Sequence, residues 1–223
     1  MSTEHPKVHP GLVLAALALG GFAIGTTEFA SMSLLPYFAK DLGVDAPTAG
    51  HAISAYALGV VVGAPVIAVA AARLPRRVIL TALMAVFAVG NLLSAFSPSF
   101  GWMIAFRFFS GLPHGAYFGV AALVAASVAP AEKRAQAVAM VLIGLTVATI
   151  VGVPLANLVG QVIGWRWGFV IVSVLASLTA TSVWLYAPRV PADADASPLR
   201  ELGALGRGRV WLTLAIGAIG FGG

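Results

Sequence analysis

Two ionisable side chains lie well inside long apolar stretches of the sequence, Glu28 and Arg107. A charge at the centre of a bilayer costs about 2.5–3.5 kcal/mol on insertion scales, and such residues usually face the interior of a helix bundle. At about 1.5 Å per residue, Glu28 is expected roughly 20–25 Å above the cytoplasmic face, and Arg107 about 10 Å below the outer face. Both depths lie in the outer half of the membrane, so the two side chains are expected to share one site.

Proton chemistry is what this pair of residue types would support. Desolvation and a neighbouring guanidinium act in opposite senses on the pKa of a buried acid, and their competition can bring its titration into the physiological range. We therefore expect Glu28 to take up and release a proton, and Arg107 to respond to the charge on Glu28. The alternative is a buried ion pair, or an acid that reaches toward the membrane surface, without a role in transport.

The apolar stretch around Arg107 also carries Gly111, Gly115 and Gly119, at four-residue steps that lie along one stripe of a helix. Glycines at this spacing let two helices approach closely in lipid. The stripe therefore predicts a packing seam and an Arg107 that faces protein. His114 lies near the stripe, either as a second titrating group or, more simply, as an interior hydrogen-bonding side chain.

A later apolar stretch holds Gly144, Gly152, Pro154 and Gly160. Proline removes a backbone donor and bends a helix, and glycine permits close contact beside the bend. A bent helix at a bundle interface is expected here, either as a moving part of alternating access or as a static kink.

Three arginines crowd one short polar turn, at Arg73, Arg76 and Arg77. They are expected to anchor the orientation of the chain, and they are candidates for a conformational gate. Other polar or large side chains in the apolar stretches are candidates to line a substrate path, although helix packing is the simpler role for most of them. This set comprises Thr26, Thr27, Met32, Tyr56, Asn91, His114, Tyr117 and Asn157, with Tyr56 the strongest candidate.

The elements that must position these residues are membrane helices. Of 223 residues, 60% are hydrophobic and 9% are charged, with a mean hydropathy of +0.96. A soluble chain of this length could not bury so much apolar surface in one core. The chain contains no cysteine, its four histidines lack metal-ligand spacing, and no cofactor is expected. The net charge of +5 comes from short clusters rather than a continuous basic face, which argues against nucleic-acid binding.

About 20 apolar residues are needed to cross the hydrocarbon layer. On this rule six helices are predicted, at residues 11–36, 49–72, 78–97, 101–128, 136–160 and 166–187. The domain organisation follows as a cytoplasmic tail (1–10), a six-helix bundle (11–187), a central cytoplasmic loop (188–209) and an incomplete seventh helix (210–223).

Orientation follows from the Lys and Arg residues, since basic flanks stay cytoplasmic. With the N-terminus inside, ten of them fall in inner segments, and Lys40 and Arg166 alone fall in outer segments. We therefore expect a multi-pass protein of a bacterial inner membrane with a cytoplasmic N-terminus, in contact with lipid.

Taken in order, several stretches resemble the major facilitator superfamily, in particular its drug:proton antiporter branch and proteins like the arabinose-efflux permeases. These stretches are residues 25–29 (GTTEF), 34–36 (LLP), 107–111 (RFFSG), 114–116 (HGA), 152–154 (GVP) with Gly160, and 164–167 (GWRW) with Phe169. The resemblance implies two six-helix halves with a substrate path between them. It also associates Glu28 with proton and substrate coupling, Arg107 with proton relay, and Gly152 and Pro154 with antiport.

Two departures from the family pattern bear on this expectation. Ala72 stands where the cytoplasmic loop motif has an acid, and Pro75 where it has a glycine, so the usual charge-locked gate is not expected to form in its usual way. The chain also ends inside what would be the seventh helix. We therefore expect the N-terminal half of a transporter that needs a C-terminal half, or a second copy, to complete the pathway.

Other functional classes fit the residues less well. No lysine follows a glycine as in an ATP-binding loop, and no catalytic pair, metal cluster or selectivity filter is visible. The expected function is therefore proton-coupled efflux of a small drug-like molecule, sugar or metabolite, with no enzymatic activity. The remaining alternative is a truncated membrane protein that does not transport, or a half-unit that must dimerise.

Overall fold

A computed structural model describes residues 9–71, 73–189 and 206–221 of the chain. All regular structure in these residues is helical. The helices are α1 (Pro10–Asp41), α2 (Ala46–Ala71), α3 (Arg76–Ala95), α4 (Phe100–Ser127), α5 (Arg134–Val147), α6 (Val153–Val162), α7 (Trp165–Tyr186) and α9 (Gly208–Phe221). A short 3₁₀ turn (Ala131–Lys133) precedes α5, and a π-helical turn (Ala148–Gly152) joins α5 to α6.

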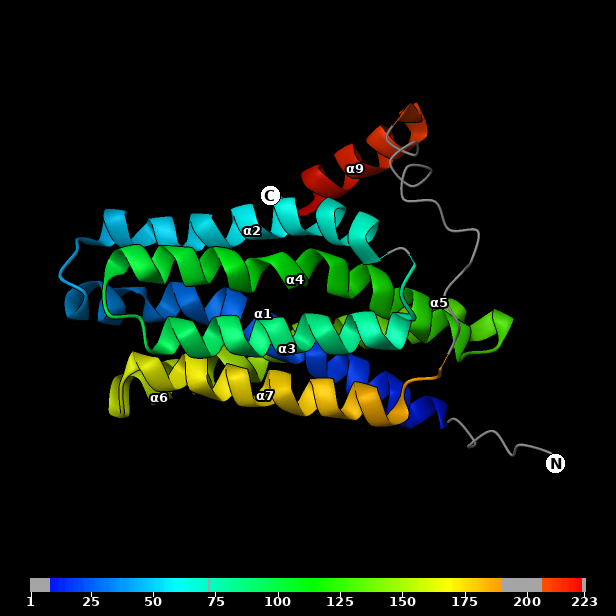
Figure 1. The fold of residues 1–223 in the computed structure, drawn as a ribbon, viewed down its shortest axis with the longest axis horizontal. Helices are drawn as coiled ribbons and strands as arrows, with labels where there is room; N and C mark the ends of the chain where they lie inside the picture. The colour runs from blue at the N-terminus through cyan, green and yellow to red at the C-terminus, as the bar shows by residue number, and fades with distance from the viewer. Residues whose placement is uncertain (1–8, 72, 190–205, 222–223) are drawn as a thin grey trace.

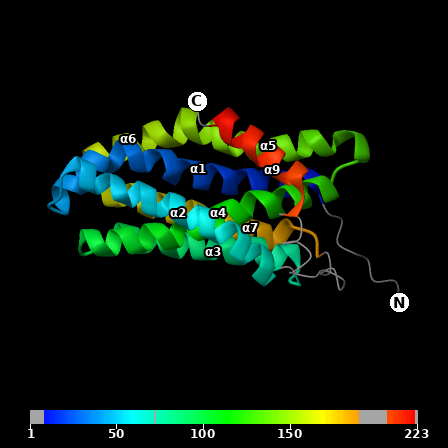
Figure 2. The same cartoon turned by 90° about the horizontal axis from the view of Figure 1, so that it is seen from above.

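Six helical segments in the described residues are long and apolar enough to cross a membrane, with α5, the π turn and α6 forming one of them. They lie side by side along the long axis of the molecule (Figures 1 and 2). The predicted all-helical membrane bundle with six spans is therefore confirmed. Residues 1–8 of the predicted tail and 190–205 of the predicted central loop lie outside the described residues.

The first helix is longer than its predicted end at residue 36. It continues to Asp41 with Pro36 inside it, because the proline ring lies on an exposed side and the turn beyond it is anchored in the core. Phe38 is 0% exposed and packs edge-to-face on Trp165 of α7. Membrane helices tolerate an internal proline when neighbouring groups hold the chain in place.

The seam between α2 and α4 is built from glycines of both helices. A Cβ on Gly59 would lie 2.2 Å from the Phe108 carbonyl oxygen, and one on Gly111 would lie 2.2 Å from the Tyr56 carbonyl oxygen. A Cβ on Gly115 would lie 2.9 Å from Ala64. The predicted stripe is thus a packing seam at two of its three glycines. Gly119 does not belong to it, because nothing lies within 4 Å of the corresponding Cβ position.

A second glycine seam joins α1 to the fifth span. A Cβ on Gly152 would lie 2.2 Å from the Thr26 hydroxyl oxygen, and one on Gly160 would lie 2.2 Å from Leu34. Between Gly144 and Pro154 the helix departs from α geometry in the π turn, a feature often found at functional sites. A bent helix was predicted from these residues, and the structure has a π turn packed against α1 at this place.

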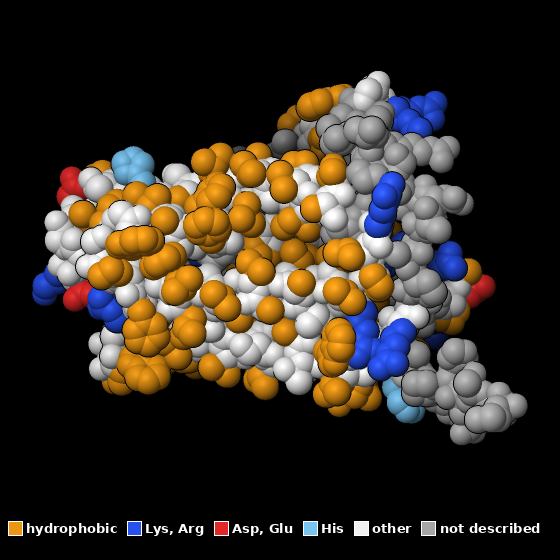
Figure 3. All heavy atoms as spheres, viewed as in Figure 1, with side chains coloured by type: hydrophobic (Ala, Val, Ile, Leu, Met, Phe, Trp, Pro, Cys, Tyr) orange, Lys and Arg blue, Asp and Glu red, His pale blue; other side chains and the backbone are white. Residues whose placement is uncertain are grey.

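Charged side chains gather at the two ends of the bundle, and apolar side chains cover the visible flank (Figure 3). One end carries the start of α1 and the turn between α2 and α3. The opposite end carries the turn between α1 and α2, where Asp45 accepts a 2.9 Å hydrogen bond from the Thr48 backbone N–H at the start of α2. Most blue side chains in this view lie at the end where α1 begins.

Candidate functional site

Arg107 lies in the middle of the bundle and is only 1% exposed. Its guanidinium carbon lies 4.2 Å from the centre of the Tyr56 ring and 5.4 Å from the centre of the Phe169 ring. Aromatic faces at this distance attract a cation, and the attraction is strengthened where water is excluded. Aromatic rings of α2 and α7 thus hold the buried positive charge of Arg107.

A short chain of hydrogen bonds leads from Arg107 across three helices. Its Nη1 donates to the Thr27 hydroxyl at 3.4 Å, and that hydroxyl donates to Asn91 Oδ1 at 2.6 Å. Asn91 Nδ2 in turn donates to the Phe87 carbonyl at 2.9 Å. Thr27 and Asn91 are 1% and 0% exposed, so this network ties α1, α3 and α4 together away from solvent.

Two further donors of Arg107 lack a partner. Nε and Nη2 are buried and have no hydrogen-bond partner among the described residues. Among the described residues, the single ion pair joins Asp41 and Arg166, at another place in the fold. Arg107 is therefore a desolvated cation with free donors and without a bound carboxylate, an arrangement that is costly unless an anion can reach it.

Glu28 is the nearest candidate for that anion. It follows Thr27 on α1, is partly buried, and lies close enough to Arg107 for the two charges to interact. The structure therefore brings the two ionisable residues together, as the depth argument predicted, but it does not join them in an ion pair.

Tyr56 and His114 form a second polar contact beside Arg107. The Tyr56 hydroxyl lies 3.0 Å from His114 Nδ1, and their ring centres are 5.8 Å apart. Tyr56 is 3% exposed. It therefore lies in the packed interior of the bundle rather than on an open surface.

Several other predicted residues lie apart from this cluster. The Tyr117 hydroxyl donates to the Leu17 carbonyl at 2.8 Å, and Thr26 bonds the Phe22 carbonyl and packs on Gly152, so both serve helix packing. Met32 is 53% exposed. Asn157 lies on α6, with a buried Oδ1 that has no hydrogen-bond partner among the residues that the structure describes.

The three arginines of the short turn differ in their surroundings. Arg73 is exposed and Arg76 partly exposed, whereas Arg77 is 9% exposed, with its guanidinium carbon 4.5 Å from the centre of the Trp184 ring. Ala72 lies outside the described residues. At this end of the bundle, Arg77 therefore packs α3 against an aromatic residue of α7.

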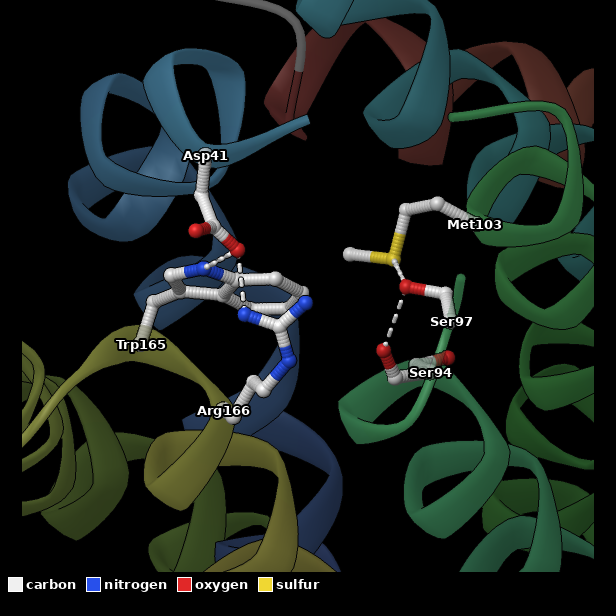
Figure 4. A network of polar contacts seen from close by, with 6 residues as sticks. All are labelled: Asp41, Ser94, Ser97, Met103, Trp165 and Arg166. Carbon is white, nitrogen blue, oxygen red and sulfur yellow. Dashed lines mark hydrogen bonds and ion pairs between the residues drawn. The ribbon is translucent and has the colours of Figure 1, made fainter. Parts of the chain in front are cut away.

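A polar cluster that the sequence argument did not identify lies at the other end (Figure 4). Asp41, at the end of α1, pairs with Arg166 and accepts a 3.2 Å hydrogen bond from Trp165 Nε1. The Arg166 guanidinium carbon lies 4.4 Å from the centre of the Trp165 ring. One signal was available beforehand, since Arg166 is the only arginine assigned to the outer segments and Asp41 ends an apolar run.

The family description "Major Facilitator Superfamily" matches residues 17–223. The chain is 44% identical over 209 residues to the inner membrane transport protein YdhP of Escherichia coli (strain K12), covering 94% of this chain and 54% of that protein. It is 40% identical over 212 residues to a chloramphenicol resistance protein of Streptomyces lividans, covering 93% and 54%.

Among solved structures, the fold is similar to an inward-facing, unoccupied bacterial homolog of the human lysosomal transporter Spinster. The TM-score is 0.69 at 20% identity, covering 86% of this chain and 46% of that chain. The similarity is one of fold. The chain spans about half the length of the relatives it matches.

Proposed function

The chain belongs to the Major Facilitator Superfamily, and we propose that it is the N-terminal half of a proton-coupled efflux transporter in which Glu28 carries the proton. The observation that carries this proposal is the state of Arg107. A buried guanidinium with two unused donors lies beside a partly buried carboxyl group and is not paired with it. Such a pair can take two arrangements that differ by one proton.

The proposed cycle follows from electrostatics. When Glu28 is protonated it carries no charge, and Arg107 rests on the aromatic rings of Tyr56 and Phe169. When Glu28 loses its proton, the carboxylate attracts the guanidinium, whose Nε and Nη2 are free to donate to it. Movement of Arg107 pulls on Thr27 and Asn91, so α1, α3 and α4 would respond to the protonation state.

The glycine seams support a moving role for α1 and the fifth span. Gly144 meets the backbone of α1 directly, at the Ala18 carbonyl oxygen, and Gly152 packs against the small side chain of Thr26. Helices that meet through small residues can shift relative to each other without rearranging large side chains. The π turn places irregular backbone in the same region.

Export is the direction favoured by the relatives, one of which is named for chloramphenicol resistance. A complete pathway would require a second six-helix unit, because the matched relatives are about twice as long. In the orientation proposed from the basic residues, the start of α1 and the start of α3, which holds Arg77, face the cytoplasm.

The experiment is antiport by the full native protein in lipid vesicles with an imposed pH gradient, using chloramphenicol as the probe. Proton movement is followed with a pH-sensitive dye when chloramphenicol is added. Glu28→Gln is expected to reduce the signal to that of empty vesicles, whereas Glu132→Gln, which removes an exposed acid before α5, retains it.

Full pH-gradient-driven activity in Glu28→Gln would refute the role of Glu28. A wild-type protein that gives no signal with chloramphenicol would exclude this probe as a substrate. In that case the same vesicles can be tested with sugars, since the dye reports proton movement whatever the partner.

A further inference from the structure

Tyr56 contacts α4 at three residues that lie about one helical turn apart. The face of its ring lies on the Arg107 guanidinium, and its hydroxyl lies 3.0 Å from His114 Nδ1. Its carbonyl oxygen packs against Gly111, where an added Cβ would lie only 2.2 Å away. Backbone, ring and hydroxyl are therefore all held by one helix.

Arg107 is held less firmly. Within the part of the chain that the structure describes, its side chain makes one hydrogen bond, to Thr27, which is long at 3.4 Å, and its Nε and Nη2 have no partner. Of the two members of this stacked pair, the ring is thus the fixed one and the guanidinium the free one.

We propose that Tyr56 is a positioning residue, whose ring holds the Arg107 guanidinium away from Glu28 until the carboxyl group loses its proton. This inference rests on the proposed function of Glu28, and it assigns Tyr56 a role other than lining the substrate path. The hydrogen bond to His114 fixes the orientation of the ring, and the face of the ring holds the Arg107 guanidinium. The ring and the carboxylate compete for one cation.

The titratable groups around the guanidinium are contributed by three helices. Glu28 comes from α1, Tyr56 from α2, and His114 from α4 itself, where it touches Tyr56. The contacts from α3 and α7 in the described residues come from the uncharged Asn91, through Thr27, and from Phe169. Removing the Tyr56 ring therefore leaves Glu28 as the strongest attraction for the cation.

The test measures the protonation of Glu28 directly, in the full native protein in lipid vesicles. Infrared difference spectra identify the band of the protonated carboxyl group by its absence in Glu28→Gln. At the pH where the wild-type band is half its maximum, Tyr56→Leu and Tyr56→Met are expected to weaken it about fivefold or more, because a cation that engages the carboxylate favours the charged form. Tyr56→Phe keeps the ring and is expected to retain the band.

Phe38→Leu is the matched control, since it removes a fully buried ring from the last turn of α1. It should leave the band unchanged. An unchanged band in both Tyr56→Leu and Tyr56→Met would overturn the proposal, as would an equal loss in Tyr56→Phe, which would assign the effect to the hydroxyl. Tyr56→Met provides the answer if Tyr56→Leu does not fold.

The infrared result is independent of transport. If Glu28→Gln transports normally, the proposed function fails, yet the band still reports whether Tyr56 controls the approach of Arg107 to Glu28. If Glu28→Gln is inactive and the band ignores Tyr56, the proposed function stands and this inference falls.

Discussion

Gly144 of α5 lies directly against the backbone of Ala18 in α1, so that a Cβ on Gly144 would be 2.0 Å from the Ala18 carbonyl oxygen. The neighbouring atom belongs to the backbone of a long helix and cannot swing aside as a flexible side chain would. The distance between α1 and the fifth span is therefore set by the absence of a side chain at this point.

Gly144→Ala should accordingly destabilise the purified protein. Forcing a methyl group into a packed contact typically costs about 1–3 kcal/mol. Gly101→Ala is the control, because nothing lies within 4 Å of its Cβ position in α4. Thermal unfolding in detergent, followed by tryptophan fluorescence, is expected to show a lower midpoint for Gly144→Ala alone. Equal midpoints for the two variants would contradict the seam.

Thr27→Val should also destabilise the protein, for a polar reason. The substitution keeps the volume but leaves Asn91 Oδ1 and Arg107 Nη1 without their partner. An unsatisfied buried group costs about 1–3 kcal/mol. Thr27→Ser retains a hydroxyl and is expected to lie near the wild type in the same unfolding measurement. Thr181→Val removes an exposed hydroxyl that bonds only within its own helix and serves as the control. If Thr27→Val and Thr27→Ser unfold together, the network contributes nothing.

Asp45 predicts a pH dependence at the start of α2. Hydrogen bonding with Thr48, from its side chain and its backbone N–H, holds the pKa of Asp45 below its ordinary value of 3.8. Because the folded pKa is depressed, the stabilisation is fully present above pH 3.8 and is lost as the pH falls through the lower folded value. Asp45→Ala should therefore melt at a lower temperature than wild type at pH 7, with the gap closing in acid.

Asp45→Asn separates the cap from the charge. Asparagine caps a helix about as well as aspartate, so this variant is expected to melt near the wild type at pH 7. A gap between wild type and Asp45→Ala that stayed constant down to the most acidic pH would show that ionised Asp45 does not stabilise α2.

The Asp41–Arg166 pair should contribute only modestly to stability. Both side chains are substantially exposed, at 47% and 41%, and exposed ion pairs give about 0.2–1 kcal/mol in double-mutant cycles. A cycle with Asp41→Asn and Arg166→Gln is expected to return a coupling in this range, and salt should weaken it. A coupling that salt leaves unchanged would instead assign the effect to the Trp165 hydrogen bond, which Trp165→Phe removes.

The bundle could be predicted from the sequence because lipid imposes a length rule that apolar runs reveal directly. The rule is less accurate where a residue's own preference favours a helix end and packing favours a longer helix. Pro36 was predicted to end the first helix, but it lies inside α1 because Phe38 beyond it is packed in the core. The packing role of Gly111 and Gly115 was also predictable, since four-residue spacing defines a helix face. Gly119 has that spacing without a neighbour, and spacing alone does not say where the adjacent helix ends.

The candidate site was predictable only as far as depth. Helical rise placed Glu28 and Arg107 at similar levels, and the structure places them near each other. Helical rise could not show that Arg107 would rest on the rings of Tyr56 and Phe169. These rings come from other helices, and the rotation of those helices about their axes depends on packing. The path candidates Tyr56 and Tyr117 share a residue type and burial, and only their contacts separate them.

The π turn changes the direction in which the residues beyond it point from the fifth span. Eight residues separate Gly144 from Gly152, and in a regular α-helix, at about 100° per residue, they would point some 80° apart. The wider turn at Ala148–Gly152 takes up one residue, so both glycines meet α1, at Ala18 and Thr26. Straightening this turn into a regular α-helix, with all of its residues kept, would rotate everything beyond it by about 100° and carry Gly160 away from Leu34. The π turn thus lets a segment with one extra residue present both glycines to α1, which a regular α-helix with the same number of residues would not do.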